Sequence, residues 1–194
     1  MLNNTTKEEY ERLVQLAGRA AVSAAALLII VKLIAWIVTG SSSILAALTD
    51  SLMDITTSII NLLAIKIALQ PADDKHRFGH GKAESIAGLA QAAFICGSAL
   101  FLLFNSISAL INKQEVVASS VGIAVMVFSV LVTIALVTFQ SYIVKKTGSL
   151  AIKADSLHYR TDIALNGTVL LALILSGLGW YWADGLFAIA VSLY

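Results

Sequence analysis

Long apolar runs separated by short polar breaks constrain the fold of this chain more than any other feature of its sequence. A helix needs about 20 predominantly apolar residues to cross the hydrocarbon core of a bilayer. Five runs reach that length and a sixth, Trp180–Tyr194, does not, so we expect an all-α membrane protein with six spans and a truncated sixth helix. The five full runs are Ala17–Val38, Ser43–Leu69, Ala83–Ile111, Val116–Val144 and Leu150–Leu175.

Composition supports this class and excludes several others. Of the 194 residues, 58% are hydrophobic and 13% are charged, whereas soluble domains carry about 25% charged residues. A single cysteine excludes a disulfide framework, and the lack of a glycine period excludes a collagen-like chain. A formal net charge of +1 gives no basic field for nucleic acid, so we expect the lipid bilayer as the partner and no nucleic acid.

Lysine and arginine gather at alternate ends of the runs, which predicts the orientation of the helices. Because cytoplasmic segments of membrane proteins are enriched in Lys and Arg, we expect the clusters and the N-terminus to be cytoplasmic. Residues 1–16 are interpreted as a cytoplasmic leader, with a short interfacial helix over Thr6–Gln15 capped by Thr6, and residues 17–194 as the transmembrane domain. The clusters are Lys7, Arg12 and Arg19; Lys75, Arg77 and Lys82; and Lys145, Lys146 and Lys153.

Two pairs of ionisable residues lie inside apolar runs, where each charge costs at least about 2.5–3.5 kcal/mol and therefore indicates a function. Asp50 and Asp54 are four residues apart in the second run, so they occupy one helix face. His158 and Asp162 have the same spacing in the fifth run. With a rise of about 1.5 Å per residue, Asp50 is level with Asp162, and Asp54 with His158. We therefore expect three carboxylates and one imidazole to converge near the membrane midplane.

Such a cluster predicts a metal site that also exchanges protons. Neighbouring carboxylates in a medium of low dielectric constant repel each other, so some should keep protons until a divalent metal displaces them. One imidazole and three carboxylates suit tetrahedral Zn²⁺ and tolerate Cd²⁺, Fe²⁺ or Co²⁺. The residues therefore predict a metal/proton antiporter that carries Zn²⁺ by alternating access.

Three other interpretations stay open on these residues. The buried charges could serve only to fix helix register, with Lys32 or Lys66 as partners. A cation channel would conduct without coupling to protons. An intramembrane metalloprotease would also bury His and Asp beside zinc, but the sequence has no HExxH motif, so we expect no enzyme.

A polar segment between the second and third runs, QPADDKHRFGHGKAE, offers a second set of ligands. Asp73, His76 and His80 have a spacing that could hold a second zinc ion on a turn. The alternative is a solvated loop with incidental histidines, because Pro71 ends the preceding helix. A metal bound there could be either regulatory or structural.

Other polar residues in the runs have more ordinary interpretations. Asp155 is expected to be an interfacial acid near the start of the fifth helix, although it could guide an ion inward. Asn166 could hold the Asp162 carboxylate or make a common interhelical contact. Lys82 and Glu84 are interpreted as an interfacial anchor and its partner.

A weak internal echo suggests an inverted repeat of three plus three spans. A Gly-Ser pair precedes an Asp-Ser-Leu triplet in both halves of the chain, at Gly40 and Asp50 and again at Gly148 and Asp155. Because the second and fifth spans run in opposite senses, the two copies would be inverted.

Three segments of this sequence resemble the cation diffusion facilitator family, and in particular its bacterial members that export ferrous iron and zinc. The segments are GSSSILAALTDSLMD, LQPADDKHRFGHGKAES and ADSLHYRTD. A histidine at position 158, where an acid could stand, is similar to the zinc-type pattern rather than the manganese-type pattern.

The resemblance implies both an activity and a set of ligands. Members of the family work as homodimers that exchange metal for protons, here in the inner membrane of a bacterial cell. Their six spans precede a cytoplasmic ferredoxin-like domain, which we expect to be absent from this chain. The implied transport-site ligands are Asp50, Asp54, His158 and Asp162, and the implied loop-site ligands are Asp73, His76 and His80.

Overall fold

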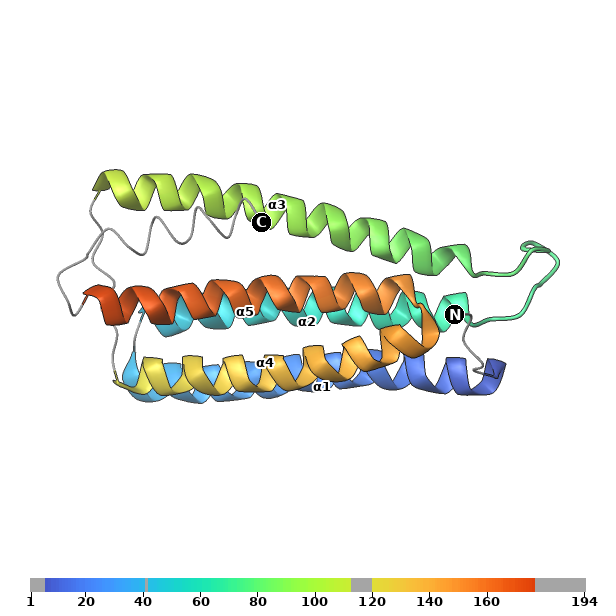
Figure 1. Cartoon of the computed structure of the whole chain (residues 1–194), viewed down its shortest axis with the longest axis horizontal. Helices are drawn as coiled ribbons and strands as arrows, with labels where there is room; N and C mark the ends of the chain where they lie inside the picture. The colour runs from blue at the N-terminus through green and yellow to red at the C-terminus, as the bar shows by residue number, and fades with distance from the viewer. Residues whose placement is uncertain (1–5, 41, 113–119, 177–194) are drawn as a thin grey trace.

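The computed structural model describes residues 6–40, 42–112 and 120–176 of the chain (Figure 1). These ranges contain five α-helices that lie roughly along one axis. The sixth apolar run, and with it the expected count of six spans, lies outside the described residues. The helices are α1 Lys7–Thr39, α2 Ser42–Ala68, α3 Lys82–Asn112, α4 Ser120–Thr147 and α5 Leu150–Ser176.

Within the described residues, each of the five full apolar runs is confirmed as a helix. Among the described residues, α1 to α4 are long and apolar enough to cross a membrane. The first half of α5 carries four charged residues, Lys153, Asp155, Arg160 and Asp162. α5 is also one of the two helices that carry the predicted site.

The start of α1 differs from the prediction. Thr6 is the N-cap, because its hydroxyl accepts a hydrogen bond from the backbone N–H of Glu9 at 3.3 Å, as the sequence predicts. The leader is nevertheless not a separate interfacial helix but the first part of α1. Val14 and Ala17 are buried against Ile65 and neighbouring side chains, so this part of α1 packs on the bundle and continues into the span without a break.

Two glycines make the tight connections between neighbouring helices. Gly40, after α1, has a φ of 62°, and Gly148, after α4, has a φ of 69°, which other residues adopt only with strain. The N–H of each bonds back to the last turn of its helix, to the carbonyls of Trp36 and Val144. The chain therefore reverses within two residues between α1 and α2 and between α4 and α5.

The packing leaves α3 at the margin of the described bundle. α1 packs against α2 and α4, and α5 packs against α4 and α3 (Figure 1). Gly18 allows α1 to approach α2 closely, since a Cβ atom there would lie 2.8 Å from the Leu62 side chain. Large apolar side chains point outward along the bundle, as expected of lipid-facing helices; they include Ile37, Val38, Ile86, Leu89 and Phe101.

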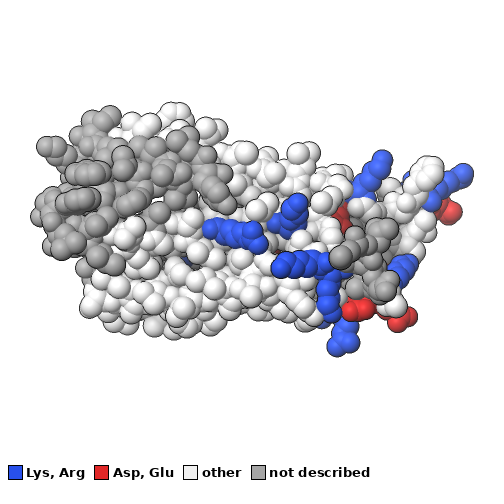
Figure 2. Space-filling view, viewed as in Figure 1, with Lys and Arg blue, Asp and Glu red and all other residues white. Residues whose placement is uncertain are grey.

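Charged side chains are unevenly distributed along the bundle. Lys and Arg gather toward the end that carries the start of α1 and the loop between α2 and α3 (Figure 2). We call this the loop end of the bundle. By the excess of positive charge, it is the end expected to face the cytoplasm.

Candidate metal centre

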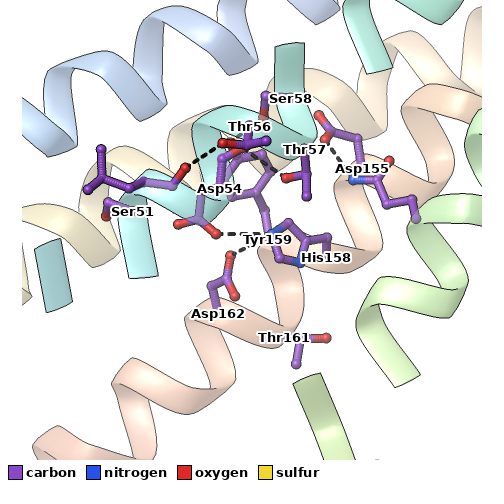
Figure 3. Close-up of polar contacts among 12 residues, drawn as sticks. Ser51, Asp54, Thr56, Thr57, Ser58, Asp155, His158, Tyr159, Thr161 and Asp162 are labelled. Atoms are coloured by element: carbon purple, nitrogen blue, oxygen red, sulfur yellow. Dashed lines mark hydrogen bonds and ion pairs between the residues drawn. The ribbon is translucent and has the colours of Figure 1, made fainter. Parts of the chain in front are cut away.

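Three of the four predicted transport-site residues meet between α2 and α5. Nε2 of His158 lies 3.1 Å from Oδ1 of Asp54 and 3.7 Å from Oδ2 of Asp162 (Figure 3). One ligand atom from each residue lies within 4.8 Å of the other two. Asp54 and His158 are buried, with 8% and 6% of their surfaces exposed. The expectation that these two residues share one depth is met.

Helix geometry explains why α5 supplies two of the three clustered side chains. His158 and Asp162 are one turn apart, so both project from the same face. Among the described residues, the buried Oδ2 of Asp162 has no hydrogen-bond partner. Asn166 does not hold this carboxylate, because its Nδ2 donates to the backbone carbonyl of Asp162 at 2.8 Å. A buried carboxylate oxygen that lies beside an imidazole and has no hydrogen-bond partner is well suited to a cation.

Asp50 does not join the other three residues. It lies one turn before Asp54 on α2, but its side chain is exposed and its carboxylate stays outside the group. The predicted convergence of four side chains is therefore observed for three of them, with the fourth on the neighbouring turn.

Lys32 and Lys66 do not form the register-fixing ion pairs considered from the sequence. Nζ of Lys32 is buried and donates to the carbonyl of Ala47 at 3.0 Å and to the hydroxyl of Ser51 at 2.6 Å. Lys66 is exposed. In the described part of the chain, neither lysine forms an ion pair with a carboxylate of the site.

Asp155 is fully buried, so its interpretation as an interfacial acid is wrong. Nε2 of Gln91 on α3 donates to one of its carboxylate oxygens at 2.9 Å, and Nε2 of Gln140 on α4 donates to the other at 2.6 Å. Both helices pack against α5. Asp155 is therefore an interior carboxyl group one turn from His158.

A cavity of about 120 Å³ lies between α2 and α3 next to this region. It has one aromatic wall, Phe94, whose ring meets the His158 imidazole edge-on with 5.8 Å between centroids. Two of its polar lining residues, Asn61 and Gln91, are buried. The remaining lining residues are Thr57, Ile60, Ala87 and Ala90.

The three loop-site residues also come together. Nδ1 of His76 lies 3.2 Å from one Asp73 carboxylate oxygen, and Nε2 of His80 lies 3.6 Å from the other. The carbonyl of Pro71 lies 3.2 Å from Nδ1 of His80 and orients that ring. The backbone N–H of His76, followed by that of Lys75, bonds to the Asp73 carboxylate and lowers its pKa below the ordinary value. Asp73 is thus kept ionised as a metal ligand requires.

Glu84 has a different role from the interfacial partner expected from the sequence. Its carboxylate accepts hydrogen bonds from the hydroxyl of Tyr10 at 3.0 Å, from the hydroxyl of Ser149, and from the N–H of Ala151 at 3.2 Å. It therefore caps α5 from a neighbouring helix and joins α1, α3 and α5 at the loop end.

Sequence reasoning missed several polar residues around the site. Ser58 on α2 and Tyr159 on α5 share a buried hydrogen bond of 2.8 Å, and Gln91 and Gln140 hold Asp155. Each is a polar side chain inside an apolar run, and that signal could have identified them.

Comparison with known proteins gives consistent results over nearly the whole chain. A family model of the cation efflux transmembrane domain matches residues 19–194. The cation-efflux pump FieF of Salmonella agona (strain SL483) is 53% identical over 187 residues, which cover 96% of this chain and 62% of that protein. The cation-efflux pump FieF of Klebsiella pneumoniae subsp. pneumoniae is 51% identical over the same coverage. The chain thus spans about 62% of the length of these relatives.

Proposed function

This chain belongs to the cation efflux family of transmembrane proteins, the cation diffusion facilitators, and from that premise we propose that it exports a divalent metal cation in exchange for protons. Zn²⁺ is the first candidate, with Fe²⁺ and Cd²⁺ as further cargo. The relatives named as cation-efflux pumps support transport rather than an enzymatic reaction.

The observation that carries this proposal is the group formed by Asp54, His158 and Asp162. It presents one imidazole nitrogen and two carboxylates in a buried position, and one oxygen of Asp162 has no hydrogen-bond partner. Nitrogen and oxygen donors in this combination suit Zn²⁺, and the lack of thiolate ligands favours release of the cargo. Asp50 becomes the fourth ligand when its side chain turns from the neighbouring position toward the ion.

Exchange follows from the chemistry of the same ligands. Carboxylates and imidazole must lose their protons to bind a metal, so binding releases protons and an excess of protons displaces the metal. In the state open to the cytoplasm, the group binds the metal ion. In the state open to the outside, external protons bind to the ligands and displace the metal ion. The cavity between α2 and α3 lies beside His158 and supports an approach to the site from the loop end.

Topology and assembly complete the proposal. The protein has six spans, with the N-terminus and the loop end in the cytoplasm, and works as a homodimer in the inner membrane. The gathering of Lys and Arg at the loop end supports this orientation. Asp73, His76 and His80 form a second metal site at that end, where a bound ion stabilises the loop.

Uptake of Zn²⁺ into proteoliposomes under an imposed pH gradient tests the function directly. We expect uptake that depends on the gradient and is lost in Asp162→Ala and Asp50→Ala. If both variants move zinc as well as the parent, the site assignment is wrong. A current that persists without any pH dependence would favour a channel over an antiporter.

A further inference from the structure

Two buried charges lie near the proposed transport site without belonging to its ligand set. They are Lys32 on α1, 7% exposed, and Asp155 on α5, fully buried. Burying an ionised group is costly unless its environment compensates for the lost water. Their positions relative to the ligands therefore need an explanation.

The positive charge is tethered to α2 through neutral groups. The Lys32 ammonium bonds to the Ala47 carbonyl and the Ser51 hydroxyl, which lie on the side of Asp54 nearer to the start of α2. These acceptors hold the ammonium in place but leave its net charge intact. It interacts electrostatically with the carboxylates of the site, including that of Asp54.

The negative charge is held by amides from two other helices. Both carboxylate oxygens of Asp155 accept an N–H, one from Gln91 and one from Gln140, an arrangement that suits an ionised carboxylate. Asp155 lies one turn from His158, on the side nearer to the start of α5. It interacts electrostatically with His158 and Asp54.

The two charges lie on opposite sides of the site along the bundle axis. α2 runs toward the loop end and α5 runs away from it (Figure 1). The start of α2 and the start of α5 are therefore at opposite ends of the bundle. Asp155 is displaced from the ligands toward the loop end, and Lys32 is displaced toward the far end.

We propose that Lys32 and Asp155 form a fixed charge gradient that sets how tightly the transport site holds a divalent cation and from which end the cation approaches. This inference rests on the proposed function. Asp155 attracts the cation on the loop side, whereas Lys32 weakens its binding and raises the barrier on the far side for entry and exit alike. The gradient supplies no energy for transport; it changes the affinity and the height of the barriers on the two sides.

Equilibrium binding of Zn²⁺ to the purified full chain tests this inference, with His76→Ala and His80→Ala present throughout to remove the loop site. We expect Lys32→Met to bind Zn²⁺ about tenfold more tightly than the parent and Asp155→Asn about tenfold more weakly, because each removes one unit charge near a divalent ion. Lys32→Arg keeps the charge and should bind within about twofold of the parent.

The direction of the two shifts separates a charge effect from a packing effect. A merely structural role would weaken binding in both variants, so shifts in the same direction, or no shift in either, would overturn the proposal. If gel filtration indicates that Asp155→Asn does not stay folded, the two Lys32 variants alone decide the test. The proposal is then overturned if Lys32→Met binds Zn²⁺ no more tightly than Lys32→Arg.

Asp54→Ala separates this inference from the proposed function. If that variant binds Zn²⁺ as tightly as the parent does, the assignment of the transport site is wrong, and the proposed charge gradient is rejected as well. If it loses binding while the Lys32 and Asp155 variants fail to shift in opposite directions, only the gradient is rejected.

Discussion

The hydroxyl groups of Ser58 and Tyr159 lie 2.8 Å apart and join α2 to α5 beside the proposed transport site. Tyr159 follows His158 in the chain, and the centroids of their rings are 5.5 Å apart. Ser58 is one turn beyond Asp54 on α2. This hydrogen bond therefore fixes the spacing of the two helices at the level where His158 meets Asp54.

We expect Tyr159→Phe to lower the free energy of unfolding by about 1 kcal/mol, because it removes a buried hydrogen bond and leaves the Ser58 hydroxyl without its partner. Thermal unfolding in detergent would measure the loss. A double-mutant cycle with Ser58→Ala is the control, since the two changes should not be additive if the hydroxyls interact. Fully additive losses would contradict the interaction.

Changing the imidazole at the site should change the ranking of ions. We expect His158→Asp to bind Mn²⁺ and to discriminate less between Zn²⁺ and Cd²⁺, because an all-oxygen set favours harder cations. Competition binding with these three ions would measure the ranking. Thr161→Ala is a matched control on the same helix, since that hydroxyl bonds to the carbonyl of Leu157. An unchanged ranking in His158→Asp would argue against a ligand role.

The cap that Glu84 provides should contribute to stability rather than to metal binding. Glu84→Ala leaves three donors without an acceptor, on Tyr10, Ser149 and Ala151, and should cost about 1–3 kcal/mol. Lys82→Ala, which truncates an exposed side chain at the start of the same helix, should change stability by less than about 0.5 kcal/mol. Thermal unfolding would compare the stability of the two variants. An equal loss of stability in both would contradict the capping role of Glu84.

The hydrogen bonds from the backbone N–H groups of Lys75 and His76 to the Asp73 carboxylate should persist in moderately acidic solution. Because backbone N–H groups lower the pKa of Asp73 in the folded protein, the stabilisation is present above the ordinary carboxyl value of about 3.9 and is lost as the pH falls through the depressed value. We expect the side-chain carboxyl ¹³C resonance of Asp73 to titrate below about pH 3.9. Asp73→Asn identifies that resonance by its loss. A midpoint above this value would contradict the role of the backbone donors.

The regularity of helices made part of the site predictable from the sequence. Spacing of four residues and a constant rise place His158 level with Asp54, and the structure confirms that pair. Depth alone does not determine how a helix is rotated about its axis. For that reason the arithmetic could not show that Asp50 would stay outside the group that Asp54 joins.

The surroundings of Asp155 could not be predicted for a related reason. Its burial depends on Gln91 and Gln140, which come from helices that are distant in sequence, and the choice of neighbours is set by packing. The start of α1 differs from the prediction for a similar reason. No proline or glycine interrupts residues 6–16, and Tyr10, Leu13 and Val14 pack on the bundle instead of on a membrane surface.

The two glycine turns described above restrict which parts of the protein can shift independently. α1 with α2, and α4 with α5, are each tied by a reversal of two residues, so we expect each pair to move as a single body. Asp54 belongs to one pair and His158 to the other. We therefore expect opening or closing of the proposed site to involve a displacement between two hairpins, in which α1 and α4 travel with the ligands although they supply none of them.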